Sequence, residues 1–329
     1  MRVALDVSPL VQTGAGTARH LRGLLAALEG RDDLELRRLS FGGPGRAAAA
    51  ARDTLWYLGL LSRRARAVGA NVLHCPTFRA PLRARVPTVV TVHDLAVLRE
   101  PAYFRRWSSA YGRALVPRVL RAATRVIAVS AFTAREAIEL AGVPEDRVRV
   151  VPNAAAEPFS PDGPAADGDY VLAVGTLEPR KNLERLMEAA RGADLELRVV
   201  GARGWGGVEV GGCGVRWLGE VGDDELARLY RGALCLAYPS LYEGFGLPVL
   251  EAMRCGTPVV TTAVSAMAEL ADGAAELVDP HDVASIAAGI ERAIARRSEL
   301  RRRGLERAQR YSWDAVAEAT VAVYREVAG

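Results

Sequence analysis

Lysine is almost missing from this chain of 329 residues. Lys181 is the single lysine, whereas the chain holds 42 arginines. A codon bias toward arginine is the simplest explanation of that imbalance, so the arginine excess excludes no function. The retention of one lysine then needs a local reason, either a functional one or drift at the start of a helix.

Cysteine and histidine are also scarce, with four residues of each. The cysteines Cys75, Cys213, Cys235 and Cys255 show no paired spacing. This favours buried thiols in a reducing cytoplasm over a disulfide framework. No His, Cys or acidic cluster has metal-ligand spacing, and Asp-Gly-Asp at 167–169 is typical of a turn, so we expect no metal.

The sequence has no uncharged apolar run of about 18 residues and no signal-peptide layout at its start. We therefore expect a cytoplasmic protein. Residues 1–158 carry 24 arginines and 13 acidic residues, a net of +11, and residues 159–329 carry 19 basic and 26 acidic residues, a net of −7. The basic half indicates an anionic partner: a membrane surface, a phosphorylated acceptor or a nucleic acid. No nucleic-acid motif supports the last.

Residues 52–69 and 99–125 mix arginine with Trp, Tyr, Phe and Leu. Such stretches are typical of peripheral contact with an anionic membrane. The alternative is that they are basic helices whose apolar stripes pack on a sheet.

Short apolar runs alternate with amphipathic stretches along the whole chain. Runs such as "RVALDV" and "TVVTVHD" lack polar alternation, which indicates parallel strands covered on both faces. The pattern restarts after a linker rich in Pro, Gly, Ala and Asp at 152–170. We therefore predict two doubly wound α/β domains, 1–158 and 159–312. Residues 281–311 are predicted to form a helix, and a terminal helix is predicted at 313–329.

The most specific signal is "YPSLYEGFGLPVLEAMRCGTPVVTT" at 238–262. A strand ends in a loop with Glu243, Gly244 and Gly246, and the helix that follows carries Glu251 eight positions after Glu243. A glycine loop that feeds a helix N-terminus is a natural anion site. "TGAGTARH" at 13–20 has only a G-x-G, not the full dinucleotide fingerprint, so a nicotinamide oxidoreductase is not supported.

These residues resemble the retaining glycosyltransferases of family 4. The Glu-x7-Glu pattern is joined by "GTLEPRKNL", "LGEVGDDELARLYRGA", "TVHDLAVL", "VIAVSAFTAREAI" and "VVPNA", in the order that the family shows. The resemblance covers nearly the whole chain. It implies the GT-B fold, two facing Rossmann-like domains, with the terminal helix returning to the first domain.

For the second domain, the resemblance implies that Arg180 and Lys181 hold the diphosphate of a nucleotide-sugar donor. An arginine supplies a planar fork, and a lysine supplies a compact charge. Glu251 would bind the ribose hydroxyls, its alternative being an exposed helix carboxylate. Glu243 would lie at the donor sugar, as a binding group rather than a nucleophile. Loop amides would contact phosphate or sugar, at Phe245, Gly246 and Leu247.

For the first domain, the resemblance implies that His93 contacts the donor sugar. A structural strand-end histidine is the alternative, and Asp94 could equally cap the next turn. Gly14 and Gly16 would bring backbone close to the donor phosphate. Thr17 and Ala18 depart from the family's usual residues there, which leaves only the glycine backbone role.

The predicted activity is transfer of a hexose from a nucleotide diphospho-sugar to a saccharide or lipid-linked acceptor in surface polysaccharide synthesis. Mannose is the first candidate for the hexose. "GTLEPRKNL" and "TVHDLAVL" look most like the mannosyltransferase branch, so GDP-mannose precedes a UDP-sugar as the expected donor. Neither cofactor nor metal is expected. The alternatives are a nucleotide-sugar epimerase or hydrolase of the same fold, and a non-catalytic nucleotide-sugar-binding protein.

Overall fold

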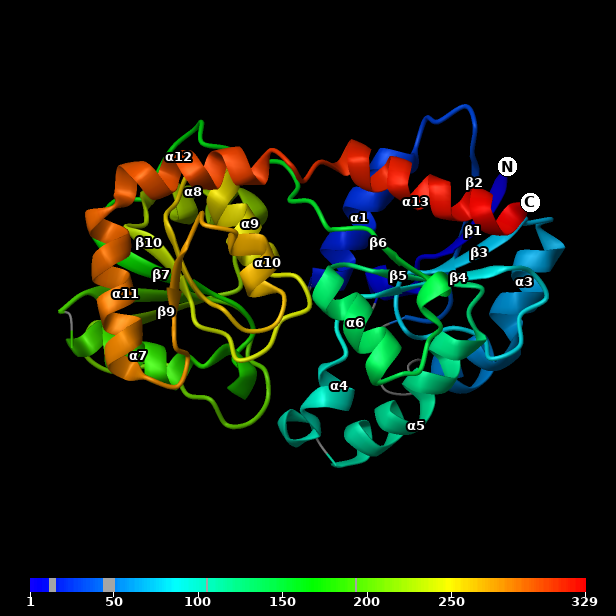
Figure 1. Cartoon of the computed structure of the whole chain (residues 1–329), viewed down its shortest axis with the longest axis horizontal. Coiled ribbons are helices and arrows are strands. Elements are labelled where there is room, and N and C mark those ends of the chain that lie inside the picture. The colour runs from blue at the N-terminus through cyan, green and yellow to red at the C-terminus, as the bar shows by residue number, and fades with distance from the viewer. Residues whose placement is uncertain (12–15, 44–50, 105, 193) are drawn as a thin grey trace. The chain divides into compact units, whose positions relative to one another are not determined.

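The computed structural model describes residues 1–11, 16–43, 51–104, 106–192 and 194–329 (Figure 1). The chain divides into two compact units. Unit 1 comprises Met1–Ala154 and Ser312–Gly329, and unit 2 comprises Ala155–Tyr311. The boundaries expected from the sequence, after residues 158 and 312, lie four residues and one residue later than these.

Unit 1 is built on a parallel sheet of six strands in the order β2-β1-β3-β4-β5-β6. The strands are β1 (Arg2–Asp6), β2 (Glu35–Leu39), β3 (Val72–Cys75), β4 (Thr88–Val92), β5 (Arg125–Ala128) and β6 (Val148–Val150). The longer helical segments are α1 (Gly16–Leu28), η2 (Arg52–Leu60), α3 (Leu61–Ala67), α4 (Ala96–Arg99), α5 (Arg106–Ala122), α6 (Ala131–Glu139) and α13 (Trp313–Ala328). The short turns are η1 (Ser8–Val11), η3 (Pro101–Tyr103) and η4 (Glu145–Arg147).

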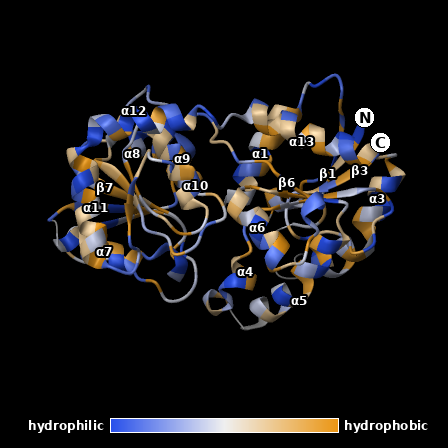
Figure 2. Ribbon diagram, viewed as in Figure 1, coloured by the Kyte–Doolittle hydropathy of each residue, from blue (hydrophilic) through white to orange (hydrophobic). Residues whose placement is uncertain are grey.

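Both faces of the inner strands β1, β3, β4 and β5 are buried, since successive residues point to opposite sides of the sheet and nearly all of them are shielded from water. Val3 and Val89 belong to a core with α1 and α13, whereas their neighbours Ala4 and Val90 belong to a core with η2, α3 and α5. Figure 2 shows the resulting apolar interior. The C-terminal helix α13 thus packs within unit 1, beside α1, after the chain has passed through unit 2.

Unit 2 repeats the plan with a parallel sheet of order β12-β11-β10-β7-β8-β9. Its strands are β7 (Tyr170–Val174), β8 (Glu196–Val200), β9 (Val215–Gly219), β10 (Cys235–Tyr238), β11 (Val259–Thr262) and β12 (Glu276–Val278). Its helices are η5 (Pro179–Lys181), α7 (Leu183–Gly192), α8 (Asp223–Gly232), α9 (Leu247–Arg254), α10 (Met267–Ala271), α11 (Val283–Ala295) and α12 (Arg297–Ala308). The predicted doubly wound fold is confirmed in both units.

The prediction of one helix over 281–311 is wrong. The chain leaves helical geometry at Arg296 (φ −98°, ψ 21°), which separates α11 from α12, and Figure 1 shows the two helices running in different directions. α11 packs its apolar face on the sheet through Ile286 and Ile290, whereas the arginine-rich α12 packs on α9. The two segments have different packing partners, so one straight helix would not bury both.

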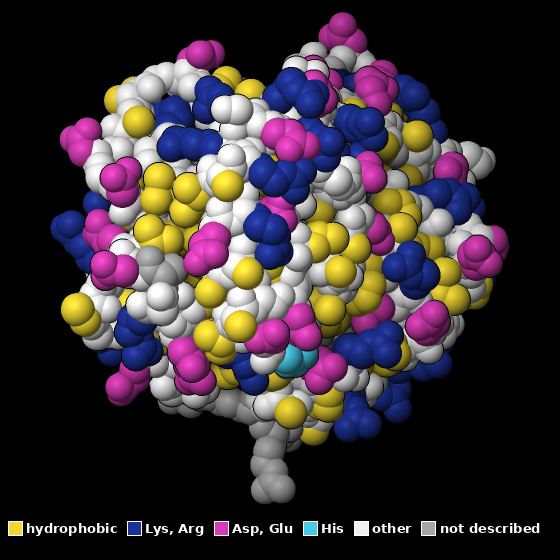
Figure 3. Space-filling model, turned by 60° about the vertical axis from the view of Figure 1, so that its left-hand side comes forward, with side chains coloured by type: hydrophobic (Ala, Val, Ile, Leu, Met, Phe, Trp, Pro, Cys, Tyr) yellow, Lys and Arg dark blue, Asp and Glu magenta, His cyan; other side chains and the backbone are white. Residues whose placement is uncertain are grey.

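Opposite charges are interspersed over the face of the molecule drawn in Figure 3. Many of the ion pairs in α12 are of this surface type, such as Arg302–Glu306, in which both side chains are 61% exposed. Exposed pairs of this kind contribute about 0–1 kcal/mol each. The fold is therefore held by the buried apolar cores of its two units rather than by its many arginines.

Candidate functional site

The strand order of unit 2 reverses between β7 and β10, which are neighbours in the sheet. Ligands of doubly wound sheets bind at such a switch point, beside the carboxyl ends of the strands. The segment "GTLEPRKNL" follows β7 directly, and "PSLYEGFGL" follows β10. The two motifs singled out in the sequence therefore flank the switch point.

Backbone and amide contacts join these two loops. The N–H of Leu241 donates to the carbonyl of Arg180 at 2.8 Å. Asn182, which adopts left-handed geometry at φ 60°, donates from Nδ2 to the carbonyls of Pro239 (3.1 Å) and Pro280 (2.6 Å). The side chain of Asn182 is buried, so these bonds fix the η5 turn against the end of β10. The turn then presents Arg180 and Lys181 toward the second loop.

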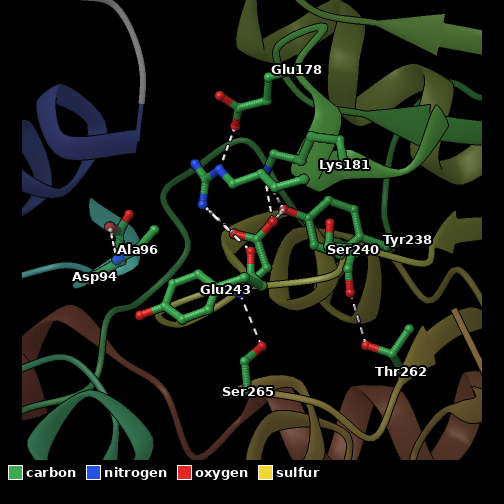
Figure 4. A network of polar contacts seen from close by, with 11 residues as sticks. Asp94, Ala96, Glu178, Lys181, Tyr238, Ser240, Glu243, Thr262 and Ser265 are labelled. Atoms are coloured by element: carbon green, nitrogen blue, oxygen red, sulfur yellow. Dashed lines mark hydrogen bonds and ion pairs between the residues drawn. The ribbon is translucent and has the colours of Figure 1, made fainter. Parts of the chain in front are cut away.

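Lys181, Tyr238 and Glu243 point toward one another (Figure 4). The Lys181 Nζ lies 2.5 Å from Glu243 Oε1 and donates to the Tyr238 hydroxyl at 2.7 Å. The Tyr238 hydroxyl in turn donates to Glu243 Oε1 at 2.8 Å. The side chains of Lys181 and Glu243 are only 10% and 8% exposed, so this ion pair is largely shielded from water.

Arg180 stands between two carboxylates. Its Nε donates to Glu178 Oε1 at 2.6 Å, and its Nη1 lies 3.7 Å from Glu243 Oε2. Glu178 is 2% exposed, and its Oε2 has no hydrogen-bond partner among the described residues. Glu178 is therefore a buried support that orients the guanidinium of Arg180.

Charge and burial act in opposite directions on this cluster. Burial raises the pKa of Glu243, but Lys181 and Arg180 outweigh it and hold the pKa below the ordinary glutamate value. Burial, followed by the charge of Glu243, raises the pKa of Tyr238 well above its usual range, so the phenol stays a donor. Burial lowers the pKa of Lys181 from its ordinary value, and Glu243 opposes that shift. The result is two cations held beside an ionised carboxylate.

The glycine loop opens directly into α9. Gly246 has φ +97°, and a Cβ there would lie 2.3 Å from Met267 Cε, so both its backbone and its surroundings require glycine. Leu247 begins α9, and Phe245 is buried with its ring edge-on to Tyr311 at 5.7 Å between centroids. The amides at the start of α9 lack helical acceptors, which is the basis of anion binding at helix N-termini.

Glu251 is not the exposed helix carboxylate of the alternative interpretation. It is 2% exposed within α9, and its Oε2 accepts a hydrogen bond from the Tyr230 hydroxyl at 3.1 Å. Tyr230 comes from α8 and is fully buried. The carboxylate is thus fixed in position by a neighbouring helix. A contact with ribose stays a prediction.

In unit 1, His93 follows the end of β4 and is half-buried. Its Nε2 lies 3.0 Å from the carbonyl of Pro76, and a carbonyl only accepts, so we assign the proton to Nε2. Burial lowers the pKa of His93 from its ordinary value, which favours the neutral ring. Nδ1 is then an acceptor suited to a hydroxyl. Asp94 caps the next turn, accepting from the N–H of Ala96 at 3.1 Å.

The remaining predicted residues are placed as follows. Gly16 is the first residue of α1, whereas Gly14 lies outside the described residues. Arg180, Lys181 and Glu243 are in direct contact, and Phe245, Gly246, Leu247 and Glu251 follow on the same loop and helix. Of the predicted site residues that the structure describes, His93 and Gly16 belong to unit 1 and the others to unit 2.

No group of three or more His, Cys, Asp or Glu side chains in the described part of the chain lies together as a metal site would require. Asp167 and Asp169, whose spacing imitates a metal motif, are exposed, and the carbonyl of Asp167 accepts from Arg198. No helix among the described residues has both the length and the apolar character needed to cross a bilayer.

Sequence reasoning missed Glu178, Tyr238 and Asn182. Glu178 and Asn182 flank the cationic pair within the quoted motif, so their place beside Arg180 and Lys181 was a usable signal. Tyr238 is a strand residue, and nothing in its local pattern separates it from other buried aromatic residues.

Two protein families match this chain. Residues 16–155 match the family described as Glycosyltransferase Family 4, and residues 157–311 match the family described as Glycosyl transferases group 1. The chain is 31% identical to "O-antigen chain mannosyltransferase B" of Escherichia coli, over 98% of this chain and 88% of that protein. It is 33% identical to "D-inositol 3-phosphate glycosyltransferase" of Frankia alni, over 73% and 68% of the two chains.

Solved structures share the whole fold. A sucrose-phosphate synthase from Thermosynechococcus elongatus superposes with a TM-score of 0.78 at 21% identity, covering 99% of this chain and 98% of that one. Anabaena Alr3699/HepE in complex with UDP-glucose superposes with a TM-score of 0.75 at 18% identity, covering 99% and 100%. At these identities the likeness establishes the architecture of two Rossmann-like units.

Proposed function

Because the chain belongs to glycosyltransferase family 4, whose members are hexosyltransferases with the GT-B fold, we propose that it transfers mannose from a nucleotide diphospho-sugar to a saccharide or lipid-linked acceptor. GDP-mannose is the first candidate donor and a UDP-sugar the second. The product belongs to polysaccharide synthesis, in keeping with the likeness to the O-antigen chain mannosyltransferase B of Escherichia coli.

The observation that carries this proposal is the pair of cations at the switch point of unit 2. Arg180 and Lys181 balance the donor diphosphate, together with the amides at the start of α9. Glu251, which is fixed in position by Tyr230, accepts hydrogen bonds from the ribose hydroxyls. Glu243 binds hydroxyls of the sugar. Glu243 is ionised and already engaged by two donors at one oxygen, which suits a binding group better than a nucleophile.

In the proposed reaction the bond between the sugar's anomeric carbon and the β-phosphate oxygen breaks through an oxocarbenium-like state. Arg180 and Lys181 stabilise the negative charge that develops on the departing phosphate. That phosphate takes the proton of the acceptor hydroxyl as the new glycosidic bond forms on the same face. The Nδ1 of His93 accepts a hydrogen bond from a hydroxyl of the sugar. The reaction retains the anomeric configuration.

The proposal requires no metal or other cofactor, because the two side-chain cations supply the positive charge that a divalent ion supplies elsewhere. Activity should therefore persist in EDTA. Loss of turnover on chelation, with recovery on adding Mg²⁺ or Mn²⁺, would contradict this part.

We further propose that unit 1 meets an anionic membrane at the cytoplasmic face. Leu55 and Leu58 of η2 are 57% and 65% exposed, and exposed arginines follow in α3 at Arg63, Arg64 and Arg66. Two exposed leucines beside three cations match an anionic interface. Burial of each leucine in lipid contributes about 1–2 kcal/mol.

The membrane contact is tested by co-sedimentation with phosphatidylglycerol vesicles. Leu55→Ser with Leu58→Ser should lower the bound fraction, whereas Leu277→Ser, at a site 45% exposed in unit 2, is the matched control and should not. Equal binding by all three proteins, or none by the wild type, would contradict the membrane contact and leave the transfer reaction untouched.

The transfer function is tested by a thermal-shift panel of GDP, UDP and ADP with their sugars, followed by turnover with the donor that stabilises most. The proposal predicts stabilisation by one diphosphate and sugar transfer to an acceptor. Release of free sugar without an acceptor would favour a hydrolase, and binding without turnover would favour a nucleotide-sugar-binding protein.

A further inference from the structure

Three rings of unit 1 are in contact in the order Trp313, His20 and His93; His20 is buried, and the other two are half-buried. His20 of α1 lies edge-on to His93, with 4.8 Å between ring centroids and an interplanar angle of 74°. Trp313, the first residue of α13, also contacts His20, with 5.8 Å between ring centroids and an interplanar angle of 52°. His93 is therefore held between His20 and the carbonyl of Pro76.

Glycine makes this packing possible. A Cβ at Gly23 would lie 2.0 Å from Trp313 Cζ2 and 2.2 Å from Cε2, so the indole occupies the space of a missing side chain. Gly23 follows His20 by three positions, which places both on one face of α1. The ring of Trp313 thus lies over the face of α1 that carries His20.

This packing leaves a polar atom without a partner. The Nε1 of Trp313 is buried and lacks a hydrogen-bond partner among the described residues, and the two ring nitrogens of His20 are buried with the Asn153 side chain as their polar neighbour. An unpaired buried polar atom such as the indole nitrogen costs about 1–3 kcal/mol, so a phenylalanine in place of Trp313 would suit stability better. The cost points to a role other than holding the fold. His20 is also kept neutral, since burial lowers its pKa well below the usual histidine value, His93 and His74 lower it further, and the side chain of Asn153 opposes them only in part.

We infer that His20 and Trp313 are positioning residues for His93, holding its imidazole in one orientation and in the Nε2–H tautomer, with Nδ1 left to accept a hydroxyl of the substrate. This rests on the proposed function, because the hydroxyl is that of the transferred sugar. Trp313 is the second residue after the chain returns from unit 2. The geometry of the sugar-side histidine thus depends on how α13 begins.

The main test uses His20→Phe and Trp313→Phe, which keep a flat ring while changing its shape and polarity. Turnover should fall by about 10- to 100-fold, the loss typical of a small misplacement of a reacting group. Donor KM and the Kd for the nucleoside diphosphate should stay within about twofold, because the diphosphate contacts lie in unit 2. Trp217→Phe, on β9 in unit 2, is the control for an indole change and should leave turnover unchanged.

The decisive readout is the state of His93 itself. With only four histidines, long-range ¹H–¹⁵N correlation resolves each ring, and exposed His281 serves as the internal reference. The inference predicts an Nε2–H signature for His93 in the wild type and in Trp217→Phe, and a changed tautomer ratio or titration midpoint in both ring variants. Gly23→Ala, which displaces the indole, should change His93 in the same way.

An unchanged His93 spectrum in His20→Phe and Trp313→Phe would overturn the inference, whatever the turnover. Unchanged turnover with a changed spectrum would overturn it as well, since the orientation would then be irrelevant to catalysis. If the wild-type protein transfers no sugar at all, the proposed function fails, and the spectra still decide whether the two residues hold His93.

Discussion

Replacing the single lysine by the residue that the chain uses everywhere else is the sharpest perturbation of the site. In Lys181→Arg the charge stays, but the compact ammonium becomes a planar guanidinium. The space for it is limited, because the Lys181 side chain is only 10% exposed and its Nζ already contacts both Tyr238 and Glu243. Overpacking of this kind costs about 1–3 kcal/mol.

That cost should appear in two measurements. The Tm of unit 2 should fall by roughly 2–4 °C for each kcal/mol lost, which a calorimetric scan detects. The Kd for the nucleoside diphosphate should rise about tenfold, as isothermal titration would show, because a displaced charge no longer meets the phosphate.

The matched control is Arg302→Lys, an exchange of the same two residue types at a site 61% exposed in α12. A surface change of that kind should stay within about 0.5 kcal/mol of the wild type. If Lys181→Arg matched the wild type in both Tm and Kd, the retention of lysine would have no structural cause at this site.

Three further changes test the surroundings of the site. Glu178→Gln should raise donor KM about fivefold, because a charge-assisted bond to the guanidinium becomes a neutral one worth about 1 kcal/mol less; an unchanged KM would show that Glu178 is not a support. Gly246→Ala should lower the free energy of unfolding of unit 2, by urea denaturation, by more than Gly273→Ala, which shares a positive φ but has open space around it; equal losses would remove the crowding argument. Burial lowers the pKa of His74 to about 3, well below the value of about 6.5 expected in the unfolded chain. The free energy of unfolding should therefore not depend on His74 above about pH 6.5, and should fall by about 1.4 kcal/mol per pH unit as the pH decreases from about 6.5 toward 3. Equal free energies of unfolding at pH 7 and pH 5 would contradict this.

Strand positions followed readily from the sequence. A parallel strand buried on both faces forms an uninterrupted apolar run in the sequence, and "RVALDV" and "TVVTVHD", interpreted in this way, form β1 and β4. Helix starts with a polar cap are also visible in a sequence: Ser130 stands directly before α6 and accepts from the N–H of Thr133 at 3.0 Å. The division of the predicted helix into α11 and α12 at Arg296 could not be predicted, because the helical periodicity of the sequence continues through this residue and only the packing partners change.

The composition of the site followed from its motifs, whereas its internal contacts did not. Lys181 and Glu243 are 62 positions apart, and their ion pair depends on β7 and β10 being neighbours. The same reason hides His20, which nothing in the helix pattern of α1 distinguishes from other inward-facing residues. Contacts of this kind come from topology, which short motifs do not encode.

The central claim is that the cations after β7 hold the diphosphate of the donor, and calorimetric titration of wild type and Lys181→Met with GDP and GMP, or with UDP and UMP if uridine nucleotides bind better, tests it most directly. The account predicts that the wild type binds the diphosphate more tightly than the monophosphate, and that Lys181→Met loses about 1.5–3 kcal/mol of diphosphate affinity with little change for the monophosphate. Equal affinities of both proteins for the diphosphate would contradict it.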